Sequence, residues 1–321
     1  MGTVAGIDEA GYGPVLGPLV VSACVFETSD PGENEPDIWA ALSDSISRAI
    51  KGAKKRIIVN DSKIVYSGTN GLRRLEESVL TFLSRGSKCP RNVPELLEML
   101  GESSGELDIY PWHRNAAEMK LPCVTNYSAV MNHGDVVAAS LRQSEIGFLG
   151  VWSKVVNVAE FNRHVSMTRN KSSLVAQKCG QHLLKIWNGW GARGVYVVCD
   201  RHGGRTNYRN LLMDCFPDAE LRVLEEEQSA SRYVLREANR SMEIVFRPEA
   251  DSSFFPTALA SMFSKYTREV FMLMLNAYWR GIVPGLEPTG GYPQDAERFL
   301  RDIAQYRDAT TAPDHILRRT R

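Results

Sequence analysis

The feature that most constrains this chain is a set of short apolar segments that each lead into acidic side chains. The segment 194–200, "GVYVVCD", is apolar up to its last residue, which is typical of a strand buried on both faces. The acids that end or follow such segments are Asp8, Glu9, Asp200 and Asp251. Because side chains at strand ends converge at one edge of a mixed sheet, these acids predict one shared site. Taken singly, Asp200 and Asp251 are equally compatible with helix capping or a solvent-facing position.

Local patterns predict a mixed α/β fold. Apolar, β-branched segments predict strands at 4–7, 19–26, 56–60, 221–226 and 242–251, the first two adjacent and antiparallel. Helical apolar spacing predicts helices at 38–50, 71–85, 170–187, 229–240, 256–279 and 294–306.

The stretch from 86 to 150 differs from its surroundings. Prolines, glycines and polar clusters interrupt it, and it shows no long periodic segment. We interpret it as an inserted cap on a single domain that spans 1–310 and has a C-terminal helical segment. The polar residues 307–321 predict a loosely ordered tail.

Composition limits the classes of function. The 38 basic and 38 acidic residues cancel, so a nucleic-acid partner would need a local basic patch rather than a global positive field. The six cysteines are scattered without metal-finger spacing, which is typical of a reduced cytoplasmic protein. No signal peptide or membrane-length apolar run is found, so we expect a cytoplasmic monomer with no membrane partner.

The predicted acid cluster favours metal chemistry. Converging carboxylates repel one another, and such a cluster is tolerated chiefly when cations occupy it. Oxygen ligands without cysteine or histidine favour Mg²⁺ or Mn²⁺, and two such ions about 4 Å apart promote phosphodiester hydrolysis. Beyond Glu9, the glycines Gly11, Gly13 and Gly17 leave backbone N–H groups open to a phosphate or a sugar hydroxyl. The pattern therefore favours a nuclease.

Five segments match, in order, the motifs of one enzyme family. Residues 6–18 match GIDEAGRGPxxGP except at Tyr12, "NDSK" at 60–63 matches a DSK motif, and 161–178 is similar to an Asn-bearing helix. "GGYPQD" at 290–295 resembles a late KGYGT motif. The residues that follow Asp251 at the offsets of a GDA…AxAS…AKxTR segment are Ala258, Ala260, Ser261, Lys265, Thr267 and Arg268. Together these segments resemble the type 2 ribonucleases H, the ribonuclease HII family.

The resemblance implies an RNase H-like fold, in which a mixed sheet is flanked by helices, and a set of site residues. Those implied to hold two Mg²⁺ or Mn²⁺ ions are Asp8, Glu9, Asp200 and Asp251. Those implied to contact the substrate are Gly11, Tyr12, Gly13, Lys63 and Tyr292, with Lys265 and Arg268 added if their helix face is exposed. The implied reaction is endonucleolytic cleavage of RNA in RNA–DNA hybrids or in ribonucleotide-containing duplex DNA, leaving 5′-phosphate and 3′-hydroxyl ends.

Two departures from the family motifs affect what is cut. Tyr12 replaces the usual arginine of the glycine loop, which keeps the backbone geometry but removes a cation beside the phosphates. Asp200 is followed by Arg201 and His202 rather than Gly-Asn, and "HGGR" at 202–205 offers a new phosphate contact. Cleavage at a single ribonucleotide is then weakened while hybrid cleavage survives. Two alternatives stay open: a hybrid-binding protein without turnover, and a related nuclease that acts on DNA.

Overall fold

The computed structural model describes residues 2–29, 35–105, 107–308 and 311–320. Its centre is a seven-stranded sheet in the order β5-β2-β1-β6-β9-β8-β7. These strands are β1 Gly2–Ala10, β2 Leu19–Thr28, β5 Gly147–Val156, β6 Val195–Asp200, β7 Glu220–Glu226, β8 Ser231–Glu237 and β9 Arg240–Arg247. Since β1 pairs antiparallel with β2 and parallel with β6, the predicted mixed sheet is confirmed.

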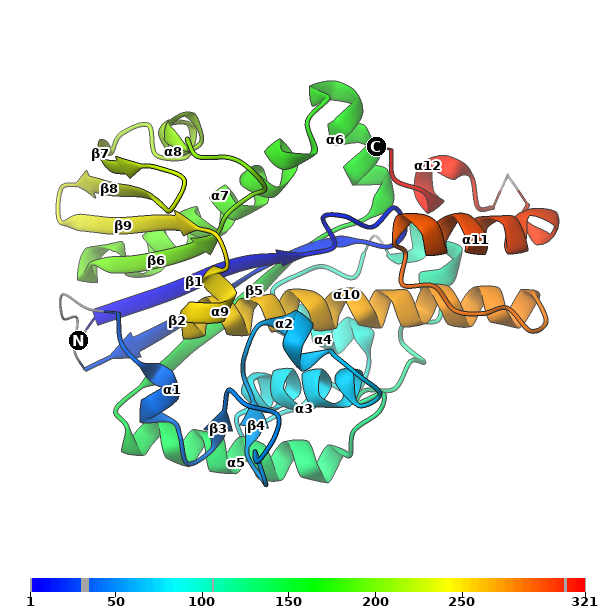
Figure 1. Ribbon diagram of the computed structural model, residues 1–321, viewed down its shortest axis with the longest axis horizontal. Helices are drawn as coiled ribbons and strands as arrows, with labels where there is room; N and C mark the ends of the chain where they lie inside the picture. Colours follow the sequence, from blue (N-terminus) through cyan, green and yellow to red (C-terminus); the bar gives the residue numbers. More distant parts are fainter. Residues whose placement is uncertain (1, 30–34, 106, 309–310, 321) are drawn as a thin grey trace.

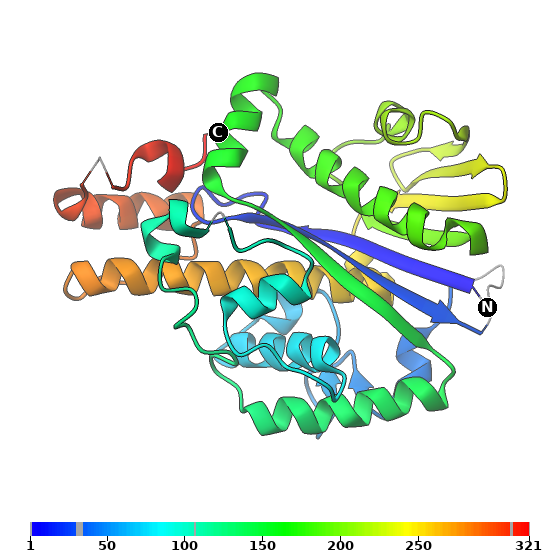
Figure 2. The ribbon, with the colours of Figure 1, turned by 180° about the vertical axis from the view of Figure 1, so that it is seen from behind.

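Helices cover both faces of this sheet (Figures 1 and 2). The longer ones are α3 Gly71–Ser84, α5 Tyr127–Gln143, α6 Val158–Thr168, α7 Lys171–Trp190, α10 Phe255–Ile282 and α11 Pro293–Ile303. The shorter ones are α1 Ile38–Ala41, α2 Ser62–Val65, α4 Val93–Met99, α8 Arg209–Cys215, α9 Ala250–Ser253 and α12 Asp314–Leu317. None of the described helices is long and apolar enough to cross a membrane.

The alternation of side chains along β1 divides the core into two layers. Val4 packs in the cluster that contains α3, α5 and α10, whereas Ala5 and Ile7 pack in the cluster that contains α7. Gly6 lets α10 approach closely, because a Cβ there would lie 2.0 Å from the backbone nitrogen of Thr257. The helix that follows Asp251 is thereby held against the strand that carries Asp8.

Three predicted elements differ from the structure. Residues 38–50 are helical only over α1, and the chain then enters β3 Ile46–Ser47. The predicted strand at 56–60 is β4 Ile57–Ile58, which pairs with β3 outside the main sheet. The predicted helix at 229–240 is mostly strand β8, because Tyr233 and Leu235 are buried on one face and the other face, with Arg232, Val234 and Arg236, is less buried.

The stretch from 86 to 150 is part of the main core. It contains the 17-residue helix α5 and leads into the edge strand β5, so the expectation of no long periodic segment is wrong. Glu76 on α3 anchors the stretch, since its carboxylate accepts hydrogen bonds from the backbone N–H groups of Cys123, Val124 and Thr125. Whether the stretch is an insertion stays a prediction.

The end of the chain is more ordered than the sequence predicts. Residues 314–317 form α12, and Arg319 is only 2% exposed. The Arg319 guanidinium donates to the backbone carbonyls of Gly11 and Gly17. A buried charge with these partners corrects the expectation of a loose tail for the described residues 311–320, because its hydrogen bonds tie the end of the chain to the first loop.

Candidate active site

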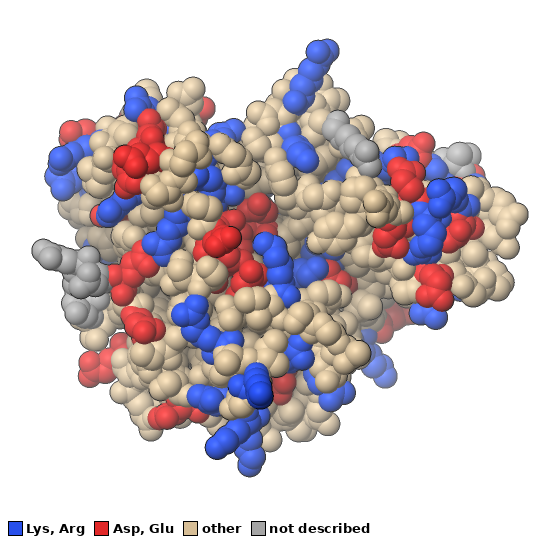
Figure 3. Space-filling view, viewed as in Figure 1, with Lys and Arg blue, Asp and Glu red and all other residues tan. Residues whose placement is uncertain are grey.

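Strand pairing brings the predicted acids together. The register that pairs Ile7 with Cys199 places Asp8 beside Asp200 at the same ends of β1 and β6. The chain then returns through β9 to α9, where the Ala250 N–H donates to Asp200 Oδ1 over 3.0 Å and positions Asp251 next to it. Figure 3 shows acidic side chains gathered near the centre of this face, where β9 turns into α9. The predicted convergence of these acids is therefore found.

Alternation along the strands separates the acids by face. Asp8 and Asp200 lie on the α10 side with Asp251, whereas Glu9 lies on the α7 side. Asp8 and Asp251 are 5% and 6% exposed. The hydroxyl of Ser261, on α10, donates to Asp251 Oδ2 over 3.5 Å. The site is thus a group of three aspartates with one glutamate at its edge.

The carboxylates perturb one another electrostatically. Burial, reinforced by the charges of Glu9 and the two other aspartates, raises the pKa of Asp8 well above its ordinary value. Burial followed by the charge of Asp61 raises the pKa of Asp251 to about 6. Burial also raises the pKa of Glu9 to about 7, although His202 opposes this shift. Burial and mutual repulsion thus both disfavour the charged carboxylates, and Lys63 and His202 offset this only in part.

The donor set fits a hard divalent cation. As the described side chains stand, no three His, Cys, Asp or Glu groups are arranged to hold a metal ion. The three aspartates nevertheless offer only carboxylate oxygens, the ligands that Mg²⁺ and Mn²⁺ prefer. A cation there would relieve the repulsion that raises their pKa values.

The DSK segment adds an acid and a cation. Asp61 caps α2 by accepting from the Lys63 N–H over 2.7 Å, and its carboxylate lies close enough to perturb Asp251. Lys63 is exposed. Partial burial alone would lower its pKa, but four surrounding carboxylates, led by Asp61, raise it. Lys63 therefore lies at the acid group, as expected, while Asp61 is a member that the sequence reasoning did not assign.

The glycine loop and the late tyrosine lie side by side. The Val15 N–H donates to the carbonyl of Gly291 over 2.8 Å, so the segment that carries Tyr292 is attached to the loop. Tyr292 is 54% exposed, which leaves its ring free to stack. Gly11 has φ +94°, a conformation that favours glycine, and a Cβ at Gly13 would meet no atom within 4 Å. The loop therefore needs glycine at position 11 for its backbone conformation, and it leaves open space beside position 13.

The resemblance implied phosphate contacts for Lys265 and Arg268 only if their helix face is exposed, and neither residue meets this condition. Arg268 is 1% exposed, and it donates to the carbonyls of Leu16 and Gly290. Lys265 forms an ion pair with Glu269 at 2.7 Å. Both charges are therefore already engaged: Arg268 joins the loop to the segment at 290, whereas Lys265 is held by Glu269 on its own helix.

Sequence reasoning missed two residues beside the site. Arg319 holds the glycine loop from more than 300 positions away, and no local signal marks it. His202, which the sequence suggests only as part of the phosphate-contacting "HGGR" segment, is 2% exposed and lies near Glu9. The side chain that interacts with His202 is Cys179 on α7. The sequence pattern predicted this helix, but nothing in the pattern indicated the contact between Cys179 and His202.

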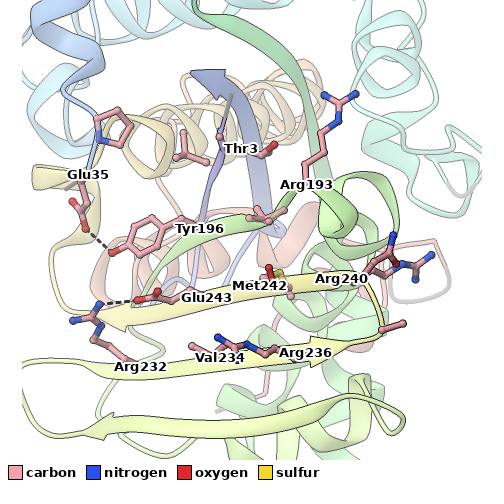
Figure 4. Close-up of a pocket in the computed structure, with 18 residues that line it drawn as sticks. Thr3, Glu35, Arg193, Tyr196, Arg232, Val234, Arg236, Arg240, Met242 and Glu243 are labelled. Atoms are coloured by element: carbon pink, nitrogen blue, oxygen red, sulfur yellow. Dashed lines mark hydrogen bonds and ion pairs between the residues drawn. The ribbon is translucent and has the colours of Figure 1, made fainter. Parts of the chain in front are cut away.

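A cavity of about 800 Å³ lies at the opposite end of the strands (Figure 4). Arg232 pairs with Glu243 at 2.7 Å, and the Tyr196 hydroxyl donates to Glu35 over 2.8 Å. Arg193 likewise pairs with Glu27, whereas Arg236 and Arg240, which also line the cavity, form no ion pair within the described residues.

Known proteins resemble parts of this chain. Ribonuclease HII from Chlamydia abortus is 34% identical over 77 residues, which are 23% of this chain and 33% of that protein. Ribonuclease HII from Xylella fastidiosa is 33% identical over 109 residues, which are 28% of this chain and 46% of that protein. The chain thus spans less than half the length of these relatives. No protein-family model matches it.

Among solved structures, ribonuclease H2 from Pyrococcus horikoshii aligns over 98% of this chain and 92% of that one. The alignment has a TM-score of 0.45 and 16% sequence identity. The resemblance predicted from the motifs is confirmed by the curated matches.

Proposed function

We propose that this divergent member of the ribonuclease HII family is a metal-dependent endonuclease that hydrolyses the RNA strand of RNA–DNA hybrids. The observation that carries the proposal is the convergence of Asp8, Asp200 and Asp251, with raised pKa values for the buried carboxyls. Perturbed acids grouped at a strand end are typical of catalytic sites. The motif matches connect this group to ribonucleases.

The acids would hold two Mg²⁺ or Mn²⁺ ions, with Glu9 completing the set from the other face. When bound, such ions supply an activated water and stabilise the leaving oxygen, and the products carry 5′-phosphate and 3′-hydroxyl ends. Lys63, exposed beside the carboxylates, would contact a phosphate. The chain would act as a monomer.

The loop at Gly11, Tyr12 and Gly13 would inspect the sugar through its backbone groups, and Tyr292 would stack on the ribose. Arg268 would position the loop through its hydrogen bonds to the backbone carbonyls of Leu16 and Gly290, and Lys265 would act indirectly, through its ion pair with Glu269. With tyrosine in place of arginine at position 12, we infer weaker cleavage at single embedded ribonucleotides than along a continuous hybrid.

A cleavage assay tests the function. A labelled RNA–DNA hybrid, an all-DNA duplex and a duplex with one ribonucleotide are incubated with the protein, with and without Mg²⁺. We expect Mg²⁺-dependent cleavage of the RNA strand of the hybrid, weaker cleavage at the single ribonucleotide, and no cleavage of the all-DNA duplex. The Asp8→Asn variant should cleave none of the three substrates. Tight metal-independent binding without cleavage would instead support the binding-protein alternative, and cleavage of the DNA duplex would support the DNA nuclease.

A further inference from the structure

A second cavity, of about 520 Å³, adjoins the acid group on the α7 side. Its lining includes Tyr12 from the glycine loop, Lys171 at the start of α7, and His202 and Arg205 from the loop after β6. His202 also interacts electrostatically with Glu9, so the cavity lies next to the edge of the acid group. Three segments far apart in sequence therefore meet beside the site.

The cavity is positively charged. Arg169, Lys171 and Arg205 line it, and no acidic side chain is among its described lining residues. No ion pair of these three cations is found in the described part of the chain, in contrast to Lys178 on the same helix, which pairs with Glu160 at 2.7 Å. Clustered cations without counter-charges attract anions.

The backbone and a buried imidazole favour the same ligand. The cavity lies at the N-terminus of α7, a 20-residue helix whose dipole is positive at that end. His202 is 2% exposed, and its Nδ1 has no hydrogen-bond partner in the described residues. A Cβ at Gly204 would meet nothing within 4 Å, so this side of the cavity is bare. An anion in this cavity would be stabilised by the positive end of the helix dipole and by side-chain hydrogen-bond donors.

Two cations of the cavity lie beside Tyr12 of the glycine loop. Lys171 Nζ lies 4.6 Å from the centre of the Tyr12 ring, and Arg205 is near enough to Tyr12 to lower its pKa against a net rise caused by burial. Two other segments thus place positive charge next to the Tyr12 ring, although the glycine loop itself carries none.

We infer that this cavity binds a backbone phosphate of the nucleic-acid strand next to the acid group, with Lys171 and Arg205 as its main contacts. Only the choice of ligand rests on the proposed function; the cavity's charge does not. The chemistry that it recognises is a phosphodiester, held by two cations and a helix N-terminus.

The test compares two double variants in the Asp8→Asn background, where binding is measured without turnover. Lys171→Gln with Arg205→Gln removes two charges from this cavity, and Arg236→Gln with Arg240→Gln removes two from the cavity at the opposite end. Hybrid affinity is measured by fluorescence anisotropy over a range of NaCl at fixed Mg²⁺. Thermal melting of each variant checks folding.

The first variant should bind roughly tenfold more weakly at low salt, and its log–log salt slope should fall by about 1 to 2 in magnitude, since each phosphate contact contributes ~0.9. The control should match the parent. Lys171→Arg with Arg205→Lys should retain the parental slope. Unchanged affinity and slope in a folded first variant would overturn the cavity's role even if the wild-type protein cleaves hybrids. A second outcome would also overturn the proposal: hybrid affinity and salt slope are unchanged in the first variant, but inorganic phosphate raises the melting temperature of the parent and not of the variant. The cavity would then be assigned to a free anion.

Discussion

Both ends of the central strands carry charged groups, but the two ends organise them differently. At one end, the larger cavity is bordered by Arg232 paired with Glu243 and by Arg193 paired with Glu27, both at 2.7 Å. At the other end, carboxylates face one another and burial raises the pKa of Asp8. The difference indicates that a group of buried carboxyls with raised pKa values, rather than cavity size, distinguishes the end to which we assign the function.

The largest expected effect comes from removing one carboxylate at each end. Asp200→Asn should lower hybrid cleavage by at least about 100-fold, because several kcal/mol of transition-state stabilisation depend on the bound cations. Glu243→Gln should leave the rate within about twofold, since its partner Arg232 is partly exposed and such pairs contribute little. Initial rates with labelled hybrid measure both. Equal losses in the two variants would remove the distinction between the ends.

The acid group should also make stability depend on pH. Its folded pKa values are raised, to about 7 for Glu9 and about 6 for Asp251, so the protonated forms stabilise the fold at low pH. That stability, on the order of 6 kcal/mol for the two groups together, is lost as pH rises from about 4 through 7. Urea unfolding in EDTA should show this loss. Mg²⁺ should restore stability at pH 8 more than at pH 5, and an equal Mg²⁺ effect at both pH values would contradict the assignment.

Much of the acid site could be predicted because it depends on local patterns. The apolar run before Asp200 specifies a buried strand, and the strand ends specify convergence. The division of Asp8 and Glu9 between faces follows from the two-residue period of β1. The local pattern of 229–240 does not separate a helix from a strand, and antiparallel pairing with β9 decides its form.

Other features depend on distant contacts. Helix α5 buries Val130, Val137 and Leu141 at helical spacing, but intervening polar residues and Gly134 weaken the pattern in the sequence. Arg319 has no periodic context, and its role exists only because the chain end returns to the carbonyls of Gly11 and Gly17. Such contacts are set by tertiary packing rather than by local propensity.

Arg319 offers a smaller perturbation of the functional end that leaves every acid in place. Arg319→Met should lower the free energy of unfolding by about 2 kcal/mol, because charged hydrogen bonds to loop carbonyls are lost. Cleavage should fall with it as the glycine loop loosens. The neighbouring Arg318→Met is the control, since Arg318 is 40% exposed at its side chain and pairs with Glu297. Denaturant unfolding and cleavage rates distinguish the two, and matching behaviour would argue against a positioning role.

The smallest expected effect is on selectivity. Tyr12→Arg should restore a cation in the glycine loop and raise cleavage at a single ribonucleotide, relative to a continuous hybrid, by roughly tenfold, about the value of one added charged hydrogen bond. Tyr12→Phe, which keeps the ring under Lys171, is the matched control. The ratio of the two rates is the measurement. A ratio that does not change in Tyr12→Arg would show that the loop cation does not set the preference.

The most direct measurement of the central claim is divalent-metal binding by titration calorimetry. Wild-type protein is compared with Asp8→Asn, Asp251→Asn and the opposite-end variant Glu243→Gln, each titrated with Mn²⁺. We expect Mn²⁺ binding in the wild type and in Glu243→Gln, and strongly weakened binding in both aspartate variants, because the buried carboxylates are the ligands. Mn²⁺ binding of equal strength in all four proteins would contradict the claim that these acids form a metal site.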